Sequence, residues 1–402
     1  MKAVTRAILA VIAVPIAAAA AFFTYVAVTT TTLYPNPEDV KSVMDSAPLP
    51  RWANAVEQGR QLVRAEVRRQ NLPGLSVAVG VGGDIVWAEG FGWADIPNRV
   101  PVAPGTRFRI GHTSKALTSA AVGLLLEKGR LRLDDEIQTY VPAFPRKRWP
   151  VTLRQLMGHM AGFKHYSGEE ADVPSAHCER ASDALPSFAN DPLLFEPGTQ
   201  YRYSTYGWIL VSAAVEAAAD APLLTFMRTQ IFTPLGMADT TFDSATEPIP
   251  NRATFYFPRL SGENNLGIEV ARPVDYSCFA GAGAFLSTPS DLVRFGLAMN
   301  NGTLLQPDTV RLLQTPQALP SGEDTEYGLG WMLDTVPLAG RPTRLANHAS
   351  RNLLGASTSF MTFPERGIVV AVTSNTSYAE TRSIALDIAG AFAEARRPSG
   401  RH

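Results

Sequence analysis

Cysteine is scarce in this chain of 402 residues, which contains only Cys178 and Cys278. The two stand 100 positions apart and neither belongs to a CxxC pair, so the sequence gives them no catalytic role. A single disulfide bond is open to them in an oxidising compartment, although sequence alone cannot test its geometry.

Net charge is also nearly absent. The chain has 36 Lys and Arg residues against 37 Asp and Glu residues. The lack of a basic excess argues against a nucleic-acid partner. A hydrophobic content of 46% is enough for a large core in one or two domains, while 31 Gly and 30 Pro predict many turns. We find no internal repeat and expect no cofactor.

Charged residues are missing from one long apolar run, Ala7 to Val28, which follows Lys2 and Arg6. The run is longer than the apolar region of a usual cleaved signal, and the basic residues precede it. We therefore expect residues 1–33 to hold an inner-membrane anchor, spanning at 7–28, with the bulk of the chain periplasmic or otherwise extracytoplasmic. The alternative is a signal peptide cleaved after small residues, which gives a secreted protein.

Residues 34–50 have the composition of a polar, proline-containing tether, and residues 51–396 form the predicted folded domain. Its first segments are typical of a helix and then of two strands joined by Gly82-Gly83-Asp84. The far end contains two strand-like runs around Pro364 to Gly367 and then an amphipathic helix. We expect these terminal segments to share one antiparallel sheet, with the mainly helical stretch 108–320 inserted between its halves.

Three stretches carry the chemistry. The first is FRIGHTSKALTSAAVGLLLEKGRL (108–131), the second is FEPGTQYRYSTYGWILVSAAVE (195–216), and the third is LANHASRNLLGASTSFMTF (345–363). In order and spacing they resemble the serine β-lactamase and penicillin-binding protein family, especially its class C-like hydrolases and mitochondrial β-lactamase-like relatives. The resemblance implies an α/β, serine β-lactamase-like fold: an antiparallel sheet from both chain ends, flanked by helices, plus a mostly helical insertion. It also implies acyl transfer or hydrolysis at an amide, ester or β-lactam bond of a small molecule or peptide.

The family chemistry explains the residue types at these positions. A Ser at helix position i and a Lys at i+3 share one face, so the lysine amine can accept the hydroxyl proton, and a Tyr held nearby can serve as base. We expect Lys115 Nζ to lie within hydrogen-bond or one-water reach of Tyr203 Oη. The resemblance implies catalytic positions at His112, Lys115, Tyr203 and His348, and substrate-binding positions at Thr205 and Ser350.

This sequence departs from the family pattern at each motif. His112 stands where the nucleophilic Ser is expected, and an acyl-imidazole hydrolyses readily, so the acyl-serine cycle is unavailable. Thr205 replaces an Asn and loses its amide. Ser350 and Arg351 stand where Gly is expected, and their side chains would crowd the strand along which substrate should lie.

Alternative interpretations remain for each of these residues. Ser114 could be the nucleophile after a register slip, although it would point about 100° away from Lys115 around a helix. Lys115 could be a solvated helix residue, Tyr203 could be core packing, and His348 could be a structural hydrogen-bonding residue.

Histidine could instead serve a metal site built from His112, His159, His165 and His348. Their spacings match no zinc motif, so we predict no metal site and interpret His159 and His165 as loop-positioning residues. Two function classes then remain. One is an extracytoplasmic serine-hydrolase relative with activity impaired by His112. The other is a non-catalytic pseudo-hydrolase that binds a cell-wall or acyl ligand.

Overall fold

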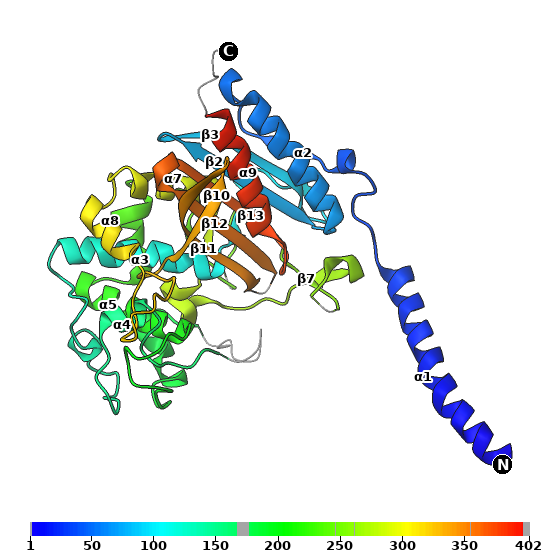
Figure 1. Cartoon of the computed structure of the whole chain (residues 1–402), viewed down its shortest axis with the longest axis horizontal. Coiled ribbons are helices and arrows are strands. Elements are labelled where there is room, and N and C mark those ends of the chain that lie inside the picture. The colour runs from blue at the N-terminus through cyan, green and yellow to red at the C-terminus, as the bar shows by residue number, and fades with distance from the viewer. Residues whose placement is uncertain (1, 167–176, 246, 261, 354, 397–402) are drawn as a thin grey trace.

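An antiparallel sheet lies at the centre of the computed structural model, which describes residues 2–166, 177–245, 247–260, 262–353 and 355–396 (Figure 1). Its strands run in the order β1-β3-β2-β13-β12-β11-β10, with β4 paired to β3. They are β1 (Ser42–Met44), β2 (Gly74–Val81), β3 (Asp84–Asp95), β4 (Val100–Pro101), β10 (Met332–Leu338), β11 (Arg341–Leu353), β12 (Ala356–Phe363) and β13 (Ile368–Ser374). Because β2 pairs with β13, strands from both ends of the chain lie side by side, as predicted.

Helices cover both faces of this sheet. Helices α2 (Ala53–Arg69) and α9 (Thr381–Ala395) pack on one face, and α7 (Pro289–Asn300) packs on the other. Side chains of β13 alternate between two apolar cores: Val370 faces the core beneath α2 and α9, whereas Val369 faces the core beneath α7. A strand buried on both faces has little polar alternation, which is why β13 is apolar from residue 368 to residue 372.

The expected turns join the strands of each terminal hairpin. Gly82 and Gly83 connect β2 to β3 with φ of +66° and +110°, backbone angles that glycine adopts without a Cβ clash. Gly367 follows the short helix η9 (Pro364–Arg366) and precedes β13, with φ of +55°.

The stretch between the halves of the sheet is mainly helical, as predicted, and forms the lobe drawn in cyan, green and yellow in Figure 1. Its helices are α3 (Ser114–Glu127), α4 (Leu153–Met157), α5 (Thr205–Ala219), α6 (Leu223–Met227), α7 and α8 (Pro307–Leu313), with short turns η3 (Gly111–Thr113), η4 (Ile137–Thr139), η5 (Ala181–Ser187), η6 (Arg228–Phe232), η7 (Asn264–Leu266) and η8 (Ser277–Ala282). Two small sheets add β5 (Phe108–Arg109), β9 (Phe285–Ser287) and β6 (Thr241–Phe242), and β7 (Tyr256–Pro258) with β8 (Ile268–Val270).

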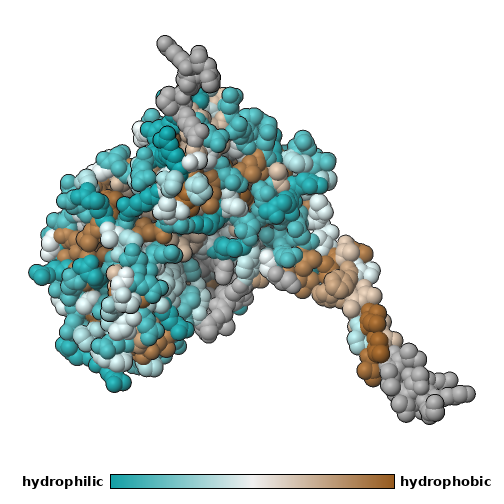
Figure 2. Space-filling view, in the orientation of Figure 1, coloured by the Kyte–Doolittle hydropathy of each residue, from teal (hydrophilic) through white to brown (hydrophobic). Residues whose placement is uncertain are grey.

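Helix α1 (Lys2–Thr29) projects away from the body of the protein (Figure 1). Its segment Val11–Thr29 has a mean hydropathy of 2.2 and is almost wholly uncovered by the domain. In Figure 2 its brown surface contrasts with the mainly teal body. By length and composition the segment is able to cross a membrane, and a signal sequence has the same features.

Residues 34–50 do not form the free tether that their composition predicts. Tyr34 and Val40 are buried, and β1 joins the sheet beside β3. The short helices η1 (Pro37–Asp39) and η2 (Pro50–Trp52) complete the segment. Its few apolar side chains pack into the domain core. This packing depends on distant residues, so the polar composition of the segment does not predict it.

Candidate active site

Lys115 lies in the first turn of α3 and is completely buried. Burial lowers the pKa of its amine well below the ordinary value because a charge loses its hydration there. Nζ donates to the carbonyl oxygen of Ala282 at 2.9 Å and lies 5.0 Å from the centroid of the Tyr203 ring. No carboxylate pairs with this amine within the described part of the chain.

Tyr203 precedes α5 by two residues, and Ser204 between them caps that helix through its side chain. The Tyr203 hydroxyl is buried with no hydrogen-bond partner among the described residues, and burial raises its pKa well above the ordinary value. Lys115 and Tyr203 are therefore neighbours, with the amine over the face of the ring and no hydrogen bond to Oη among the described residues. Contact between Nζ and Oη through one water stays a prediction.

His112 occupies η3, immediately before α3, and its ring centroid lies 5.7 Å from that of Tyr203. Its Nε2 is within hydrogen-bond distance of two hydroxyls, Tyr166 Oη at 3.1 Å and Thr205 Oγ1 at 3.3 Å. Burial, and then the nearby charge of Lys115, lower the His112 pKa well below the ordinary value. The imidazole is thus neutral at neutral pH.

Ser114 does not enter this cluster. Its side chain is fully buried, and its hydroxyl accepts a hydrogen bond from the backbone N–H of Phe285 at 3.4 Å. This contact is made with β9, and no hydrogen bond joins the Ser114 hydroxyl to His112, Lys115 or Tyr203 among the described residues, so the geometry argues against the register in which Ser114 is the nucleophile.

His348 brings strand β11 to the cluster. The pairing of β10 with β11 stops at Met332 and Asn347, so His348 is the first residue beyond it. Its carbonyl oxygen accepts from Thr113 Oγ1 at 3.4 Å, and its Nε2 lies 3.2 Å from Tyr327 Oη. Burial lowers the pKa of His348 to about 3.

Ser350 and Arg351 differ in where their side chains lie. Ser350 is buried, and its hydroxyl has no partner among the described residues. Arg351 instead bonds to Glu380 at 2.6 Å, next to the start of α9 on the opposite face of the sheet. The expectation that both side chains crowd the cleft is therefore wrong for Arg351, because successive residues of a strand point to opposite faces.

Two more histidines support the second motif, as their loop positions indicated. His159 Nδ1 accepts the backbone N–H of Ser204 at 3.1 Å, and His165 Nδ1 accepts that of Thr205 at 3.2 Å. The His159 ring also lies against Tyr203, with centroids 4.1 Å apart. Within the described residues, no group of three or more His, Cys, Asp or Glu side chains is arranged to hold a metal ion.

Two tyrosines in contact with the cluster were not predicted. Tyr166 ends the stretch VTLRQLMGHMAGFKHY, so its nearness to His165 was a usable signal. Tyr327 belongs to no recognisable motif. It reaches His348 Nε2 from the loop before β10, a contact that only the folded structure shows.

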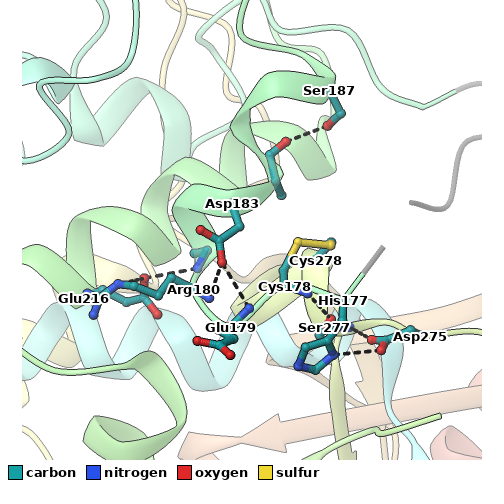
Figure 3. Close-up of a disulfide and its surroundings, with 12 residues drawn as sticks. His177, Cys178, Glu179, Arg180, Asp183, Ser187, Glu216, Asp275, Ser277 and Cys278 are labelled. Atoms are coloured by element: carbon teal, nitrogen blue, oxygen red, sulfur yellow. Dashed lines mark hydrogen bonds and ion pairs between the residues drawn. A yellow bond between two sulfur atoms is a disulfide. The ribbon is translucent and has the colours of Figure 1, made fainter. Parts of the chain in front are cut away.

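The disulfide bond that the sequence left open between Cys178 and Cys278 is formed, with the two Cα atoms 4.9 Å apart (Figure 3). Cys278 belongs to η8, the segment that ends with Ala282, the acceptor of the lysine amine. The Ser277 hydroxyl accepts the backbone N–H of Cys178, and His177 pairs with Asp275 beside it. The disulfide thus ties η8 to the preceding part of the lobe.

The fold and these three motifs lead to one family. The sequence profile described as Beta-lactamase matches residues 60–394. The chain belongs to this family. It is 30% identical, over 85% of its length and 81% of the relative's, to the mouse serine beta-lactamase-like protein LACTB, mitochondrial. It is 29% identical to penicillin-binding protein 4* of Bacillus subtilis, over 66% of this chain and 61% of that protein.

Solved structures share the fold. The octameric penicillin-binding protein homologue from Pyrococcus abyssi superposes with a TM-score of 0.71 at 23% identity, covering 82% of this chain and 76% of that one. The D-amino acid amidase from Ochrobactrum anthropi, complexed with L-phenylalanine amide, gives 0.67 at 22% identity, covering 85% and 97%. The serine β-lactamase-like architecture predicted from the sequence is therefore confirmed.

Proposed function

We propose that this chain is a membrane-anchored, extracytoplasmic β-lactamase-family protein whose cleft binds a small acylated or peptide ligand without an acyl-serine cycle. One observation carries the proposal: an imidazole stands at the nucleophile position, with its Nε2 held by the hydroxyls of Tyr166 and Thr205. Thr205 is itself fully buried, and Ser114 points elsewhere. No serine hydroxyl of the motif is thus placed to be acylated.

The surroundings of His112 suit the uncharged acyl or amide group of a ligand. His112, His165 and His348 have lowered pKa values, caused mainly by burial, and the phenols of Tyr203 and Tyr327 stay protonated because burial raises theirs. Neutral rings of this kind stack on amide or acyl planes and offer hydrogen bonds without attracting a strong ionic charge. The ligand class we propose is an acyl compound or a cell-wall peptide fragment.

A groove meets the cluster at Tyr201 and Tyr327 and offers room for part of such a ligand. It has a volume of about 390 Å³ and continues along Asn347, Ala349 and Arg382, on the α9 side of β11, so a ligand that fills it reaches the His112 cluster past Tyr327. Pockets of this size hold small organic ligands. Its lining residues are Tyr201, Thr325, Glu326, Tyr327, Met332, Leu333, Asp334, Asn347, Ala349 and Arg382.

A second candidate function is slow hydrolysis in which His112 itself attacks the acyl carbon or activates water. The retained Lys115 and Tyr203 favour it, since an amine with a lowered pKa remains available to move a proton. His348 would then help to hold the acyl group. We rank this candidate second because Nε2 is already engaged.

For location, we propose that α1 remains attached and spans the inner membrane, with residues after about 33 on the periplasmic side. The apolar segment Val11–Thr29 and the basic residues before it support this topology. Cleavage of α1 as a signal peptide, with secretion of the domain, is the alternative.

Intact mass measured after incubation with a fluorophosphonate or benzylpenicillin tests the proposal. We expect no mass increase in the wild type, but a rise in melting temperature with benzylpenicillin if the cleft binds it. His112→Ser should gain the probe at residue 112, because Lys115 lies one turn away. His112→Ser with Ser114→Ala is the matched control and should still be labelled.

Other results would change the assignment. Labelling of the wild type at His112 favours the hydrolytic candidate, whereas labelling at Ser114 means that the motif register is wrong. If no acyl or muropeptide probe labels the protein and none shifts its melting temperature, the binding proposal is rejected.

A further inference from the structure

The last turn of α1 is held by the turn between β7 and β8. Arg259, directly after β7, donates from Nη2 to Thr29 Oγ1 at 2.9 Å, and its guanidinium lies 5.6 Å from the centroid of the Tyr25 ring. The same Nη2 also bonds to the carbonyl oxygen of Leu266. Val26, between the two contacted residues of α1, is only 6% exposed. The helix is therefore docked on the domain at its C-terminal end.

The chain that leaves α1 is fixed as well. The side chain of Asn71 accepts the backbone N–H of Leu33 at 2.9 Å and donates to the carbonyl oxygens of Thr31 and Asn264. Tyr34 is buried and donates to the Pro73 carbonyl at 2.7 Å. Because a short, hydrogen-bonded connector replaces a flexible hinge, the domain cannot swing freely about the end of α1.

These contacts place one part of the surface beside the helix end. Asn71 joins the connector to η7, and Arg259 joins α1 to Leu266, so η7 is next to the place where α1 leaves the domain. An apolar span that ends at Thr29 has its boundary with the polar lipid layer there, and Tyr and Arg side chains are typical of that boundary.

We propose that the β7–β8 turn, Arg259 with Asn264–Leu266, rests in the headgroup layer of the bilayer that α1 enters, and so holds the domain in one orientation on the membrane. The Arg259 guanidinium bridges α1 and the turn at this level. The inference depends on the proposed function in one respect, namely that α1 stays attached and spans the membrane. The partner is the lipid surface, because the turn is continuous with the docked end of the span.

Fluorescence quenching on the full chain, reconstituted in phosphatidylcholine vesicles, tests this placement. The two native cysteines form a disulfide, so a single introduced thiol is labelled selectively. Asn265→Cys reports the turn and Asn54→Cys is the matched control, because both residues are exposed. Asn265 contacts Arg69 at the end of α2, and Asn54 lies near the start of that helix, about 22 Å from Arg69 at 1.5 Å per residue. Phe23→Cys reports the exposed face of α1.

We expect lipids spin-labelled in the headgroup to quench most of the fluorescence at position 265 and little at position 54, while acyl-chain labels quench position 23. Arg259→Gln should lower quenching at position 265 and leave that at position 23 unchanged. Quenching at position 23 with none at position 265 overturns the inference alone. Absence of quenching at position 23 overturns the membrane span and the inference together. A label at position 265 that is shielded from water but not quenched by the headgroup spin labels also overturns the inference and assigns the turn to a protein partner.

Discussion

Glu89 and Lys115 are both buried ionisable residues, but their surroundings differ. Glu89, 1% exposed, lies in the sheet and accepts hydrogen bonds from Arg60 and from Trp87 Nε1. Lys115, 0% exposed, has one backbone acceptor and the face of an aromatic ring. A charge that is matched by partners stabilises a fold, whereas an unmatched one has its pKa displaced, and displaced pKa values concentrate at functional sites.

Some buried polar atoms of the site also lack a partner. They are the Tyr203 hydroxyl, His159 Nε2 and the Ser350 hydroxyl, and the described part of the sheet has such atoms too, at Ser76 and Thr373. His159 also adopts a left-handed backbone with φ of +59°. Such features cost stability and persist where the surrounding structure enforces them, as in binding and catalytic sites. A ligand that supplied partners to these atoms of the site would therefore stabilise the protein.

The largest effect should come from the disulfide behind Lys115. Replacing Cys178 and Cys278 with Ser opens a crosslink across a sequence separation of 100 residues, and we expect a loss of about 3–5 kcal/mol of unfolding free energy. Denaturant unfolding measures it, with reduced wild type as the second sample. Hydrogen exchange should quicken more around η8 than in β2 and β13, which exchange through global unfolding. Equal acceleration in both regions would contradict the link between the disulfide and the site.

The two buried residues should respond oppositely to neutral replacements. Glu89→Gln leaves Arg60 without its main partner and should destabilise the protein by about 2–4 kcal/mol. Lys115→Met keeps a similar volume and removes an unpaired amine, so it should be within about 1 kcal/mol of the wild type or more stable. Chemical denaturation compares them. A Lys115→Met variant as unstable as Glu89→Gln would mean that the amine is a structural group.

The sequence predicted different amounts of structure in the sheet and in the candidate site. Apolar strand patterns and the Gly82-Gly83 turn predicted the paired hairpins, because local periodicity and turn chemistry determine them. The packing of residues 34–50 was missed, since burial of Tyr34 and Val40 depends on distant partners. In the site, the spacing of the three motifs predicted that four residues lie close together, namely His112, Lys115, Tyr203 and His348.

Side-chain direction was the part that spacing could not supply. The sequence does not show that Lys115 Nζ turns to Ala282 in η8, far along the chain, instead of to the Tyr203 hydroxyl. Tyr327 was likewise invisible, because it reaches His348 only after β10 and β11 pair. Long-range contacts of this kind depend on the assembled fold.

Acidification should lower the free energy of unfolding through the buried histidines of the site. Burial lowers the pKa of His348 to about 3 and that of His165 to about 4, from an ordinary value of 6.5. Below about pH 6.5 these histidines take up protons in the unfolded chain, whereas in the folded chain they stay neutral until the pH approaches 3 to 4. Their contribution to the free energy of unfolding is therefore fully present above pH 6.5 and is lost as the pH falls from 6.5 toward 3 to 4. Between pH 7 and pH 5 we expect these two histidines to contribute a loss of about 1–3 kcal/mol, counting the partly exposed His165 at less than its full value. His112 and His159, whose pKa values burial also lowers, add to the loss in the same direction.

Denaturant unfolding at each pH checks this, with two histidine variants as a matched pair. His348→Gln should flatten the pH dependence. His177→Gln should not flatten it, because the hydrogen bond to Asp275 raises the pKa of His177, a contribution that is present at low pH and lost as pH rises. An unchanged pH slope in His348→Gln would show that His348 is not the group that takes up the proton.

The smallest effect concerns the strand beside the nucleophile position and uses the His112→Ser background, in which labelling can be followed. Ser350 shares a face of β11 with His348, toward the cleft, whereas Arg351 points to Glu380 near α9. In the proposed substrate path along β11, Ser350→Gly removes a side chain, so the labelling rate should rise by a factor of about three to ten, equivalent to about 1 kcal/mol of activation free energy. Arg351→Gly, the matched control, should change the rate little. A larger gain from Arg351→Gly than from Ser350→Gly would mean that the substrate strand lies on the α9 side of β11, and the position of the cleft would have to be reassigned.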